Sequence, residues 1–293
     1  MSESRHNPDQ LLKEIQADEE NRNKGHLKIF FGYAAGVGKT YAMLEAAHME
    51  KQQGIDVVAG YVEPHARPKT AALLNGLEVL PTREVFYNGM ILDEFDIGMA
   101  LKRKPQLILV DELAHTNAEG CRHAKRYQDI KELLNAGIDV YTTVNVQHIE
   151  SLCDTVASIT EIVVRERIPD SISDNADQVE LIDIEPQDLI NRLNTGNVYR
   201  QTQEKQAVEN FFTIENLTAL REISLRRCAD RVNILTENTR IKNHGDYHTG
   251  EHILVCLSSS PSNAKIIRTA AKMASAFKGE FTALFVETPD FSV

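Results

Sequence analysis

The residues of this sequence best suited to chemistry gather in two short motifs, and the first is GYAAGVGKT at 32–40. A small glycine-rich turn that opens a helix lets backbone N–H groups converge on phosphate oxygens, and the positive helix end adds attraction. Lys39 would reach the β- and γ-phosphates, and Thr40 would offer its hydroxyl to Mg²⁺. The motif predicts a phosphate site built from Gly32, Ala35, Gly36, Val37, Gly38, Lys39 and Thr40.

One position of this loop departs from the usual spacing. A glycine followed by four residues and Gly-Lys-Thr would place a glycine where the chain has Tyr33. The missing glycine is the one leaving the strand, farthest from the γ-phosphate, so the loop still forms if Tyr33 keeps a negative φ. The alternative is a strand, turn and helix with chance glycines, and Lys-Thr directly after Gly-Val-Gly argues against it.

The second motif is PQLILVDELAHTN at 105–117, an apolar run ending in Asp111 and Glu112. An acid at the carboxyl end of such a strand is placed to hold Mg²⁺, usually through water. The neighbouring Glu112 is a candidate general base that orients or deprotonates an attacking water. Alone, Asp-Glu after a strand indicates an ordinary helix start, but together with the loop it favours a nucleotide site.

Weaker signals suggest groups that sense the γ-phosphate. Thr143 and Asn145 end the following strand, although polar residues are common at strand ends in any case. Arg122 and Arg126 follow the acidic motif and are candidates to neutralise phosphate charge, and a solvated basic helix face is an equal alternative. No Asn-Lys-x-Asp follows the later strands, so ATP is the default nucleotide.

These motifs need a framework of elements to position them, and short apolar runs alternate with helical patterns along the chain. This alternation predicts an α/β fold, a mostly parallel sheet with helices on both faces. The expected strands are 27–31, 56–61, 84–87, 106–110, 138–143, 161–165 and 178–183. The expected helices are 39–53, 68–75, 91–103, 123–136, 146–157, 186–194 and 203–230.

The 293 residues divide into unequal parts. A polar lead-in at 1–26 precedes the main domain at 27–235, and the polar stretch 236–250 is expected to be a linker. The remaining strand, helix and strand at 251–293 are too few to bury a stable core alone. This tail is therefore expected either to dock on the first domain or to be cut from something longer.

Composition narrows the class of protein. The net charge of −11 argues against a nucleic-acid partner, and no apolar run approaches membrane-spanning length, so no direct membrane insertion is expected. The four cysteines lie far apart and form no CxxC pair, which fits a reducing cytoplasm.

The stretch VDELAHTNAEGCRHAKRYQDIKELLNAGIDVYTTVNVQHIESL at 110–152 closely resembles the N-terminal cytoplasmic domain of the KdpD family. The resemblance runs from about Lys28 to Val232, and the family's loop also lacks the glycine at Tyr33. It implies a P-loop NTPase-type domain that binds ATP and Mg²⁺ within membrane sensor histidine kinases for potassium supply. The partners implied are a kinase core and membrane domain, in the same full-length protein or in a separate sensor subunit.

The tail resembles the start of a universal-stress-protein domain, which follows in this family and is reported in some members to bind cyclic di-AMP. The residues that match this ligand pattern are Ser258, Ser260, Phe281, Thr282, Ala283 and Phe285, the last replacing a tyrosine. Serine hydroxyls at a strand-to-helix turn suit a phosphodiester, and aromatic rings suit adenine. The alternative is a polar Ser-Pro turn that caps the next helix, with core residues in the strand.

Three functions follow in order of preference. The first is an ATP-binding regulatory module that tunes the balance of kinase and phosphatase output. The second is a stand-alone P-loop ATPase with Glu112 as catalytic base, and the third is a scaffold whose loop is only structural. The family's phospho-accepting histidine and kinase motifs are missing from the sequence, so autophosphorylation by this polypeptide alone is not expected.

Overall fold

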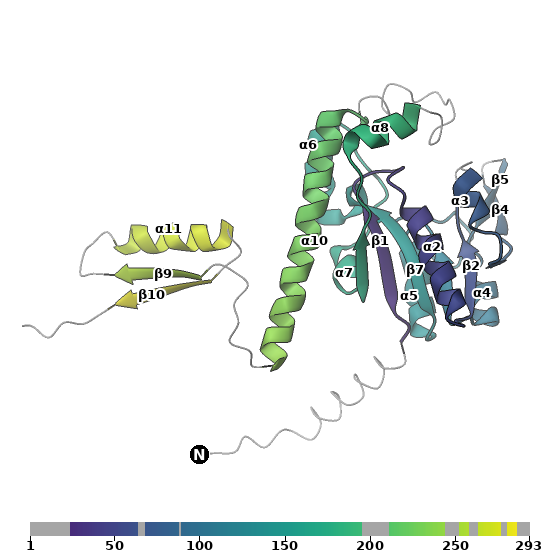
Figure 1. Cartoon of the computed structure of the whole chain (residues 1–293), viewed down its shortest axis with the longest axis horizontal. Helices are drawn as coiled ribbons and strands as arrows, with labels where there is room; N and C mark the ends of the chain where they lie inside the picture. The colour runs from purple at the N-terminus through teal and green to yellow at the C-terminus, as the bar shows by residue number, and fades with distance from the viewer. Residues whose placement is uncertain are drawn as a thin grey trace, which may run out of the picture. The chain divides into compact units, whose positions relative to one another are not determined.

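The computed structural model describes residues 24–63, 68–87, 89–194, 211–243, 252–257, 263–276 and 280–285. The chain divides into two compact units, Met1–Cys228 and Ala229–Val293 (Figure 1). No helix of the described segments is long and apolar enough to cross a membrane.

The first unit is built on a parallel sheet. Its strands are β1 (Leu27–Gly32), β2 (Val57–Tyr61), β3 (Glu78–Val79), β6 (Leu107–Val110), β7 (Asp139–Asn145) and β8 (Gln178–Leu181). They lie in the order β3-β2-β6-β7-β1-β8, and every neighbouring pair is parallel. Parallel neighbours need long crossover connections, which the helices of this unit supply. The predicted α/β fold class is confirmed.

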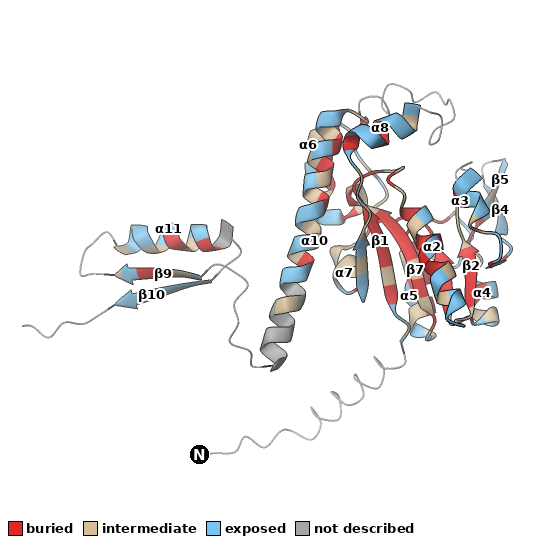
Figure 2. Cartoon of the chain, viewed as in Figure 1, coloured by how far each residue is buried: buried red, intermediate tan, exposed pale blue. Residues whose placement is uncertain are grey.

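Helices cover both faces of this sheet. They are α2 (Lys39–Gln52), α3 (Pro68–Ala72), α4 (Ile97–Arg103), α5 (Arg126–Asn135), α6 (Cys153–Thr160), α7 (Asp170–Asp174), α8 (Pro186–Asn194) and α10 (Ile214–Asn243), with 3₁₀ turns η1 (Val146–His148) and η2 (Glu150–Leu152). Successive strand residues face opposite sides, so Ile29 and Phe31 join a core with α5, α8 and α10, while Phe30 packs with α2. Figure 2 shows β1 and β7 buried along most of their length.

A β-hairpin outside the main sheet corrects two predictions. Its strands are β4 (Arg83–Tyr87) and β5 (Met90–Glu94), which pair with each other and form a separate antiparallel sheet. The strand expected at 84–87 is therefore no part of the parallel sheet, and the helix expected from residue 91 begins only at Ile97. Gly89 explains the difference, because its φ of 83° permits the tight turn between the two strands.

The second unit contains β9 (His252–Leu257), α11 (Asn263–Ala276) and β10 (Glu280–Phe285). The two strands are parallel, and Val255, Ala270 and Ala274 are buried between strand and helix. The strand-helix-strand pattern expected for the tail is thus present in the structure. The helix α10 continues to Asn243, so the first part of the linker expected at 236–250 is helical instead.

Candidate functional site

The backbone of the loop between β1 and α2 depends on its glycines. Gly36 and Gly38 take φ values of 93° and 115°, which side chains rarely adopt. At Gly32 a Cβ atom would stand 2.7 Å from Cγ2 of Val37, closer than real Cβ contacts allow. Three of the predicted glycines are therefore required by the conformation of the loop itself.

Tyr33 does not disturb this loop. Its φ is not positive, and its side chain is fully buried in the core. Its hydroxyl donates a hydrogen bond to the carbonyl of Ile184 at 3.1 Å. Burial raises the pKa of this hydroxyl to about 12. The unusual residue is therefore a core residue behind the loop, and its negative φ satisfies the condition set by the sequence.

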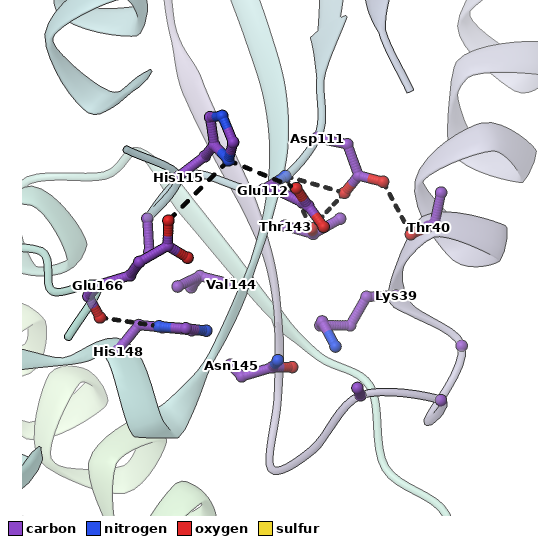
Figure 3. Close-up of a pocket in the computed structure, with 14 residues that line it drawn as sticks. Lys39, Thr40, Asp111, Glu112, His115, Thr143, Val144, Asn145, His148 and Glu166 are labelled. Carbon is purple, nitrogen blue, oxygen red and sulfur yellow. Dashed lines mark hydrogen bonds and ion pairs between the residues drawn. The ribbon is translucent and has the colours of Figure 1, made fainter. Parts of the chain in front are cut away.

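The sheet order brings the second motif to the loop. Since β7 lies between β1 and β6, the carboxyl ends of three neighbouring strands meet at one edge. Asp111, just after β6, accepts hydrogen bonds from the hydroxyl of Thr40 at 3.0 Å and from the hydroxyl of Thr143 on β7 (Figure 3). Asp111 is buried, and Lys39 donates to the carbonyl of Ala34 at 3.0 Å. Residues far apart in sequence thus form one polar cluster.

Glu112 occupies a strained backbone position beside this cluster. Its φ is 60°, which is uncommon for a residue other than glycine and is found mainly where the surroundings enforce it. Its N–H donates to Oδ1 of Asp111 at 3.1 Å and lies 3.3 Å from the hydroxyl of Thr143. These contacts, one to the preceding residue and one to β7, hold the strained turn, and the Glu112 carboxylate lies in the wall of the pocket.

One pocket collects most of the predicted residues. Those that line it are Ala35, Gly36, Gly38, Lys39, Thr40, Asp111, Glu112, Thr143 and Asn145. Gly32 and Val37 shape the loop without lining the pocket. Five further residues line the pocket for which no such role is predicted from the sequence, and these are Ala114, His115, Val144, His148 and Glu166. The sequence gives no local signal for Glu166, whereas His115 and His148 follow the two strands that carry the site.

The chemistry of this lining fits a metal-bound polyphosphate. Three carboxylates, on Asp111, Glu112 and Glu166, share the pocket with Lys39. Their negative charge would repel a bare anion, and Mg²⁺ reverses that repulsion. The side-chain oxygen of Asn145 is buried without a hydrogen-bond partner among the described residues, so this acceptor is open to a donor such as a metal-bound water. The residues present therefore fit a polyphosphate carried with Mg²⁺.

The structure corrects the expectation that Arg122 and Arg126 face the phosphates. Arg126 is fully buried behind the motif, where it donates to Oε2 of Glu94 at 3.1 Å and to the carbonyl of Asp111 at 3.2 Å. Arg122 pairs with Glu132 at 2.5 Å. Neither arginine lines the pocket. Arg126 instead supports the Asp111 backbone from behind.

Glu94, at the end of β5, is the buried acid that balances Arg126. It also contacts Nε2 of His115 at 3.2 Å and accepts from the N–H of Ala118 at 2.8 Å. Burial opposes its ionisation, but these hydrogen bonds and the charge of Arg126 outweigh burial and lower the pKa of Glu94. The charged pair fixes the loop that follows Asp111.

His148 should make the stability of the domain depend on pH. Burial lowers its pKa below the ordinary value of 6.5, although its contact with the Glu166 carbonyl at 2.9 Å acts in the opposite direction. The unfolded chain therefore binds a proton at a pH where the folded chain does not. We expect the free energy of unfolding to fall as pH drops below 6.5, by at most about 1.4 kcal/mol per pH unit from this group.

Denaturant titrations between pH 7.5 and pH 5 measure this slope. His148→Gln should flatten it. His26 is the matched control, because its hydrogen bond with Asp177 raises its pKa, so its contribution is present below 6.5 and lost as pH rises through the raised value. His26→Gln should therefore steepen the loss of stability. An unchanged slope in His148→Gln contradicts the assignment.

The structure describes four of the six residues predicted to bind cyclic di-AMP. Ser258 and Ser260 lie outside the described residues. The other four lie on β10, where Phe281, Thr282, Ala283 and Phe285 are exposed, and Thr282 contacts Nε2 of His252 at 2.9 Å. The ligand site therefore stays a prediction.

Comparisons with known proteins match nearly the whole chain. A family model described as "KdpD: Osmosensitive K+ channel His kinase sensor domain" matches residues 23–232. The chain is 58% identical over 287 residues to the Sensor protein KdpD of Clostridium acetobutylicum and 50% identical over 290 residues to that of Escherichia coli (strain K12). Each match covers 97% of this chain and 32% of the relative. A Putative sensor protein KdpD of Synechocystis sp. is 47% identical over 263 residues, with 90% of this chain and 70% of the relative covered.

Proposed function

The chain belongs to the KdpD family of osmosensitive K⁺ channel histidine kinase sensor domains, and from this membership we propose that it binds ATP with Mg²⁺ as a regulatory input. One observation carries the proposal. Lys39, Thr40 and Asp111 meet at a pocket whose loop needs glycine at two positive-φ positions. A structural turn alone requires neither the buried acid nor the lysine at the same place.

Each side chain has a separate role in this proposal. The loop N–H groups and Lys39 bind the β- and γ-phosphates, while the Thr40 hydroxyl and Asp111 hold the metal, Asp111 through water. Mg²⁺ supplies the positive charge that joins the phosphates to this acidic pocket. Thr143 orients Asp111, and the side-chain amide N–H₂ of Asn145, at the end of β7, donates to the terminal phosphate. Binding therefore draws on three neighbouring strands.

The regulatory role is proposed because the chain matches only one part of longer sensor proteins. It spans 32% of the length of two relatives named sensor proteins. We propose a cytoplasmic module whose partners are a kinase core and a membrane domain, in the same protein or in a separate subunit. ATP would shift the balance between kinase and phosphatase output by as much as its affinities for two conformations differ.

Glu112 separates this function from the alternative, a stand-alone ATPase. For a regulatory module we expect the unmodified chain to bind ATP with Mg²⁺ and to release phosphate no faster than a Lys39→Ala control. Calorimetric titration and a phosphate-release assay measure the two properties. Adding a chelator should weaken binding, because the three pocket carboxylates then face the phosphates directly.

Hydrolysis that depends on Glu112 would support the ATPase function. Robust steady turnover that falls about 100-fold or more in Glu112→Gln establishes a general base and the ATPase function instead. If the unmodified chain does not bind ATP with Mg²⁺ at all, the third function, a scaffold whose loop is only structural, is supported instead. The position of Glu112 in the pocket wall is the observation that keeps the ATPase function in contention.

A further inference from the structure

Tyr33 does more than fill space behind the phosphate loop. A phenylalanine would occupy the same buried volume, so the distinctive contribution of tyrosine is its hydroxyl. That hydroxyl donates to the carbonyl of Ile184 at 3.1 Å. Ile184 lies in the segment 182–185, which connects β8 to α8. The residue that replaces a loop glycine thus bonds directly to a connection far along the chain.

The segment 182–185 touches the phosphate loop at two further points. The N–H of Ile182 donates to the carbonyl of Phe31 at 2.8 Å, just before the loop begins. Cγ2 of Ile182 stands 3.9 Å from the point where a Cβ on Gly38 would lie, just before the helix begins. The segment therefore lies against the start, the Tyr33 side chain and the end of the loop.

The same segment holds the helix α10. Asp183 and Glu185 flank Ile184, and both accept hydrogen bonds from Arg221 of α10. The guanidinium Nε lies 2.8 Å from Oδ1 of Asp183, and another guanidinium nitrogen lies 2.7 Å from Oε2 of Glu185. Leu217 and Leu220 anchor this stretch of α10 in the core, with no exposed surface. Arg221 is thus the polar contact between the segment and the helix.

We infer that Tyr33 and the segment 182–185 couple occupation of the phosphate loop to the docking of α10. The inference rests on the proposed nucleotide binding and adds the route by which binding is passed on. A shift of the loop moves the Tyr33 hydroxyl and with it the Ile184 carbonyl, which lies between the two acids that hold Arg221. The helix α10 receives the signal at Arg221. Since α10 is continuous from the first unit into Ala229–Val293, the signal can pass along the helix.

Hydrogen exchange of α10 with and without ATP and Mg²⁺ tests the coupling. Exchange in residues 217–228 should slow by about fivefold or more on binding, the lower end of ordinary allosteric coupling. Tyr33→Phe should still bind the nucleotide, measured by calorimetry, but should lose this slowing. Arg221→Lys should lose it too, because an ammonium cannot bond both acids in the same geometry.

Tyr141→Phe is the matched control, since Tyr141 is a partly buried tyrosine of the same sheet whose hydroxyl donates to Oε1 of Glu50, at 2.9 Å, and not to the segment 182–185. It should keep the full response of α10. Binding by the unmodified chain without slower exchange in α10 overturns the coupling and leaves nucleotide binding intact. A normal response in Tyr33→Phe, or an equal loss in Tyr141→Phe, also overturns it. No binding at all refutes the proposed function instead.

Discussion

Lys39→Ala is expected to weaken the binding of ATP with Mg²⁺ by roughly 10- to 100-fold, the cost of losing one hydrogen-bonding cation from a charged ligand. Lys39 is buried at the start of α2, beside the positive-φ glycine Gly38. Its ammonium group is the one lysine charge in the described pocket lining, so the remaining loop N–H groups would face the phosphates with less support. Calorimetric titration measures the change.

Lys51 provides the control on the same helix. It lies in the last turn of α2, outside the pocket, and bonds to the carbonyl of Gly76. Lys51→Ala should bind the nucleotide as the unmodified chain does, which separates a local contact from a general effect of charge. Circular dichroism should show that both variants stay folded. If Lys39→Ala binds ATP with unchanged affinity, the assignment of the phosphate site to this loop is wrong.

Arg126→Met should lower the free energy of unfolding by about 3–5 kcal/mol, because it removes the arginine charge that balances the buried carboxylate of Glu94. Both side chains are almost completely buried. Arg126 also bonds to the Asp111 carbonyl and stacks over the ring of Tyr61, with Cζ 4.1 Å from the ring centre. Its loss therefore disturbs the strand end that carries Asp111. Denaturant titration measures the effect.

Two further variants define the cause of that loss. Arg103→Met removes an arginine that bonds two acids, Asp56 and Glu78, at the surface, and it should cost far less. The double change Arg126→Met with Glu94→Leu should recover much of the stability, since the buried carboxylate is removed together with its arginine. Because the pKa of Glu94 is lowered from 4.5, its contribution is present above that pH and lost as pH falls through the lowered value. An Arg126→Met cost no larger than that of Arg103→Met contradicts the argument.

The phosphate loop and the Asp111 strand end were predictable because both are local patterns. A glycine-rich turn before Lys-Thr and an acid that ends a buried strand can be recognised from a few neighbouring residues, and in the structure both line one pocket. A ligand site at this edge of the sheet is also predictable, since the carboxyl ends of parallel strands meet at the same edge. The strand order itself then decides which motifs meet.

The role of Arg126 was beyond local reasoning. On the sequence it is one basic residue among several at a helix start, and only the packed fold shows that it lies under the sheet edge and faces Glu94. Residues 161–165 illustrate the same limit. Their apolar run resembles a strand, yet in the structure Glu161 ends α6 with a φ of 58° and the following residues join no strand. Pairing partners are a property of the whole sheet.

The placement of the site on β1, β6 and β7 affects how the protein withstands proteolysis. These strands lie inside the sheet, with β2 and β3 beyond them on one side and β8 on the other. Edge elements open most easily in local fluctuations, whereas central strands separate only when the whole domain unfolds. A protease that captures opened edges would therefore meet a ligand site still assembled, and loss of nucleotide binding would report global rather than local unfolding.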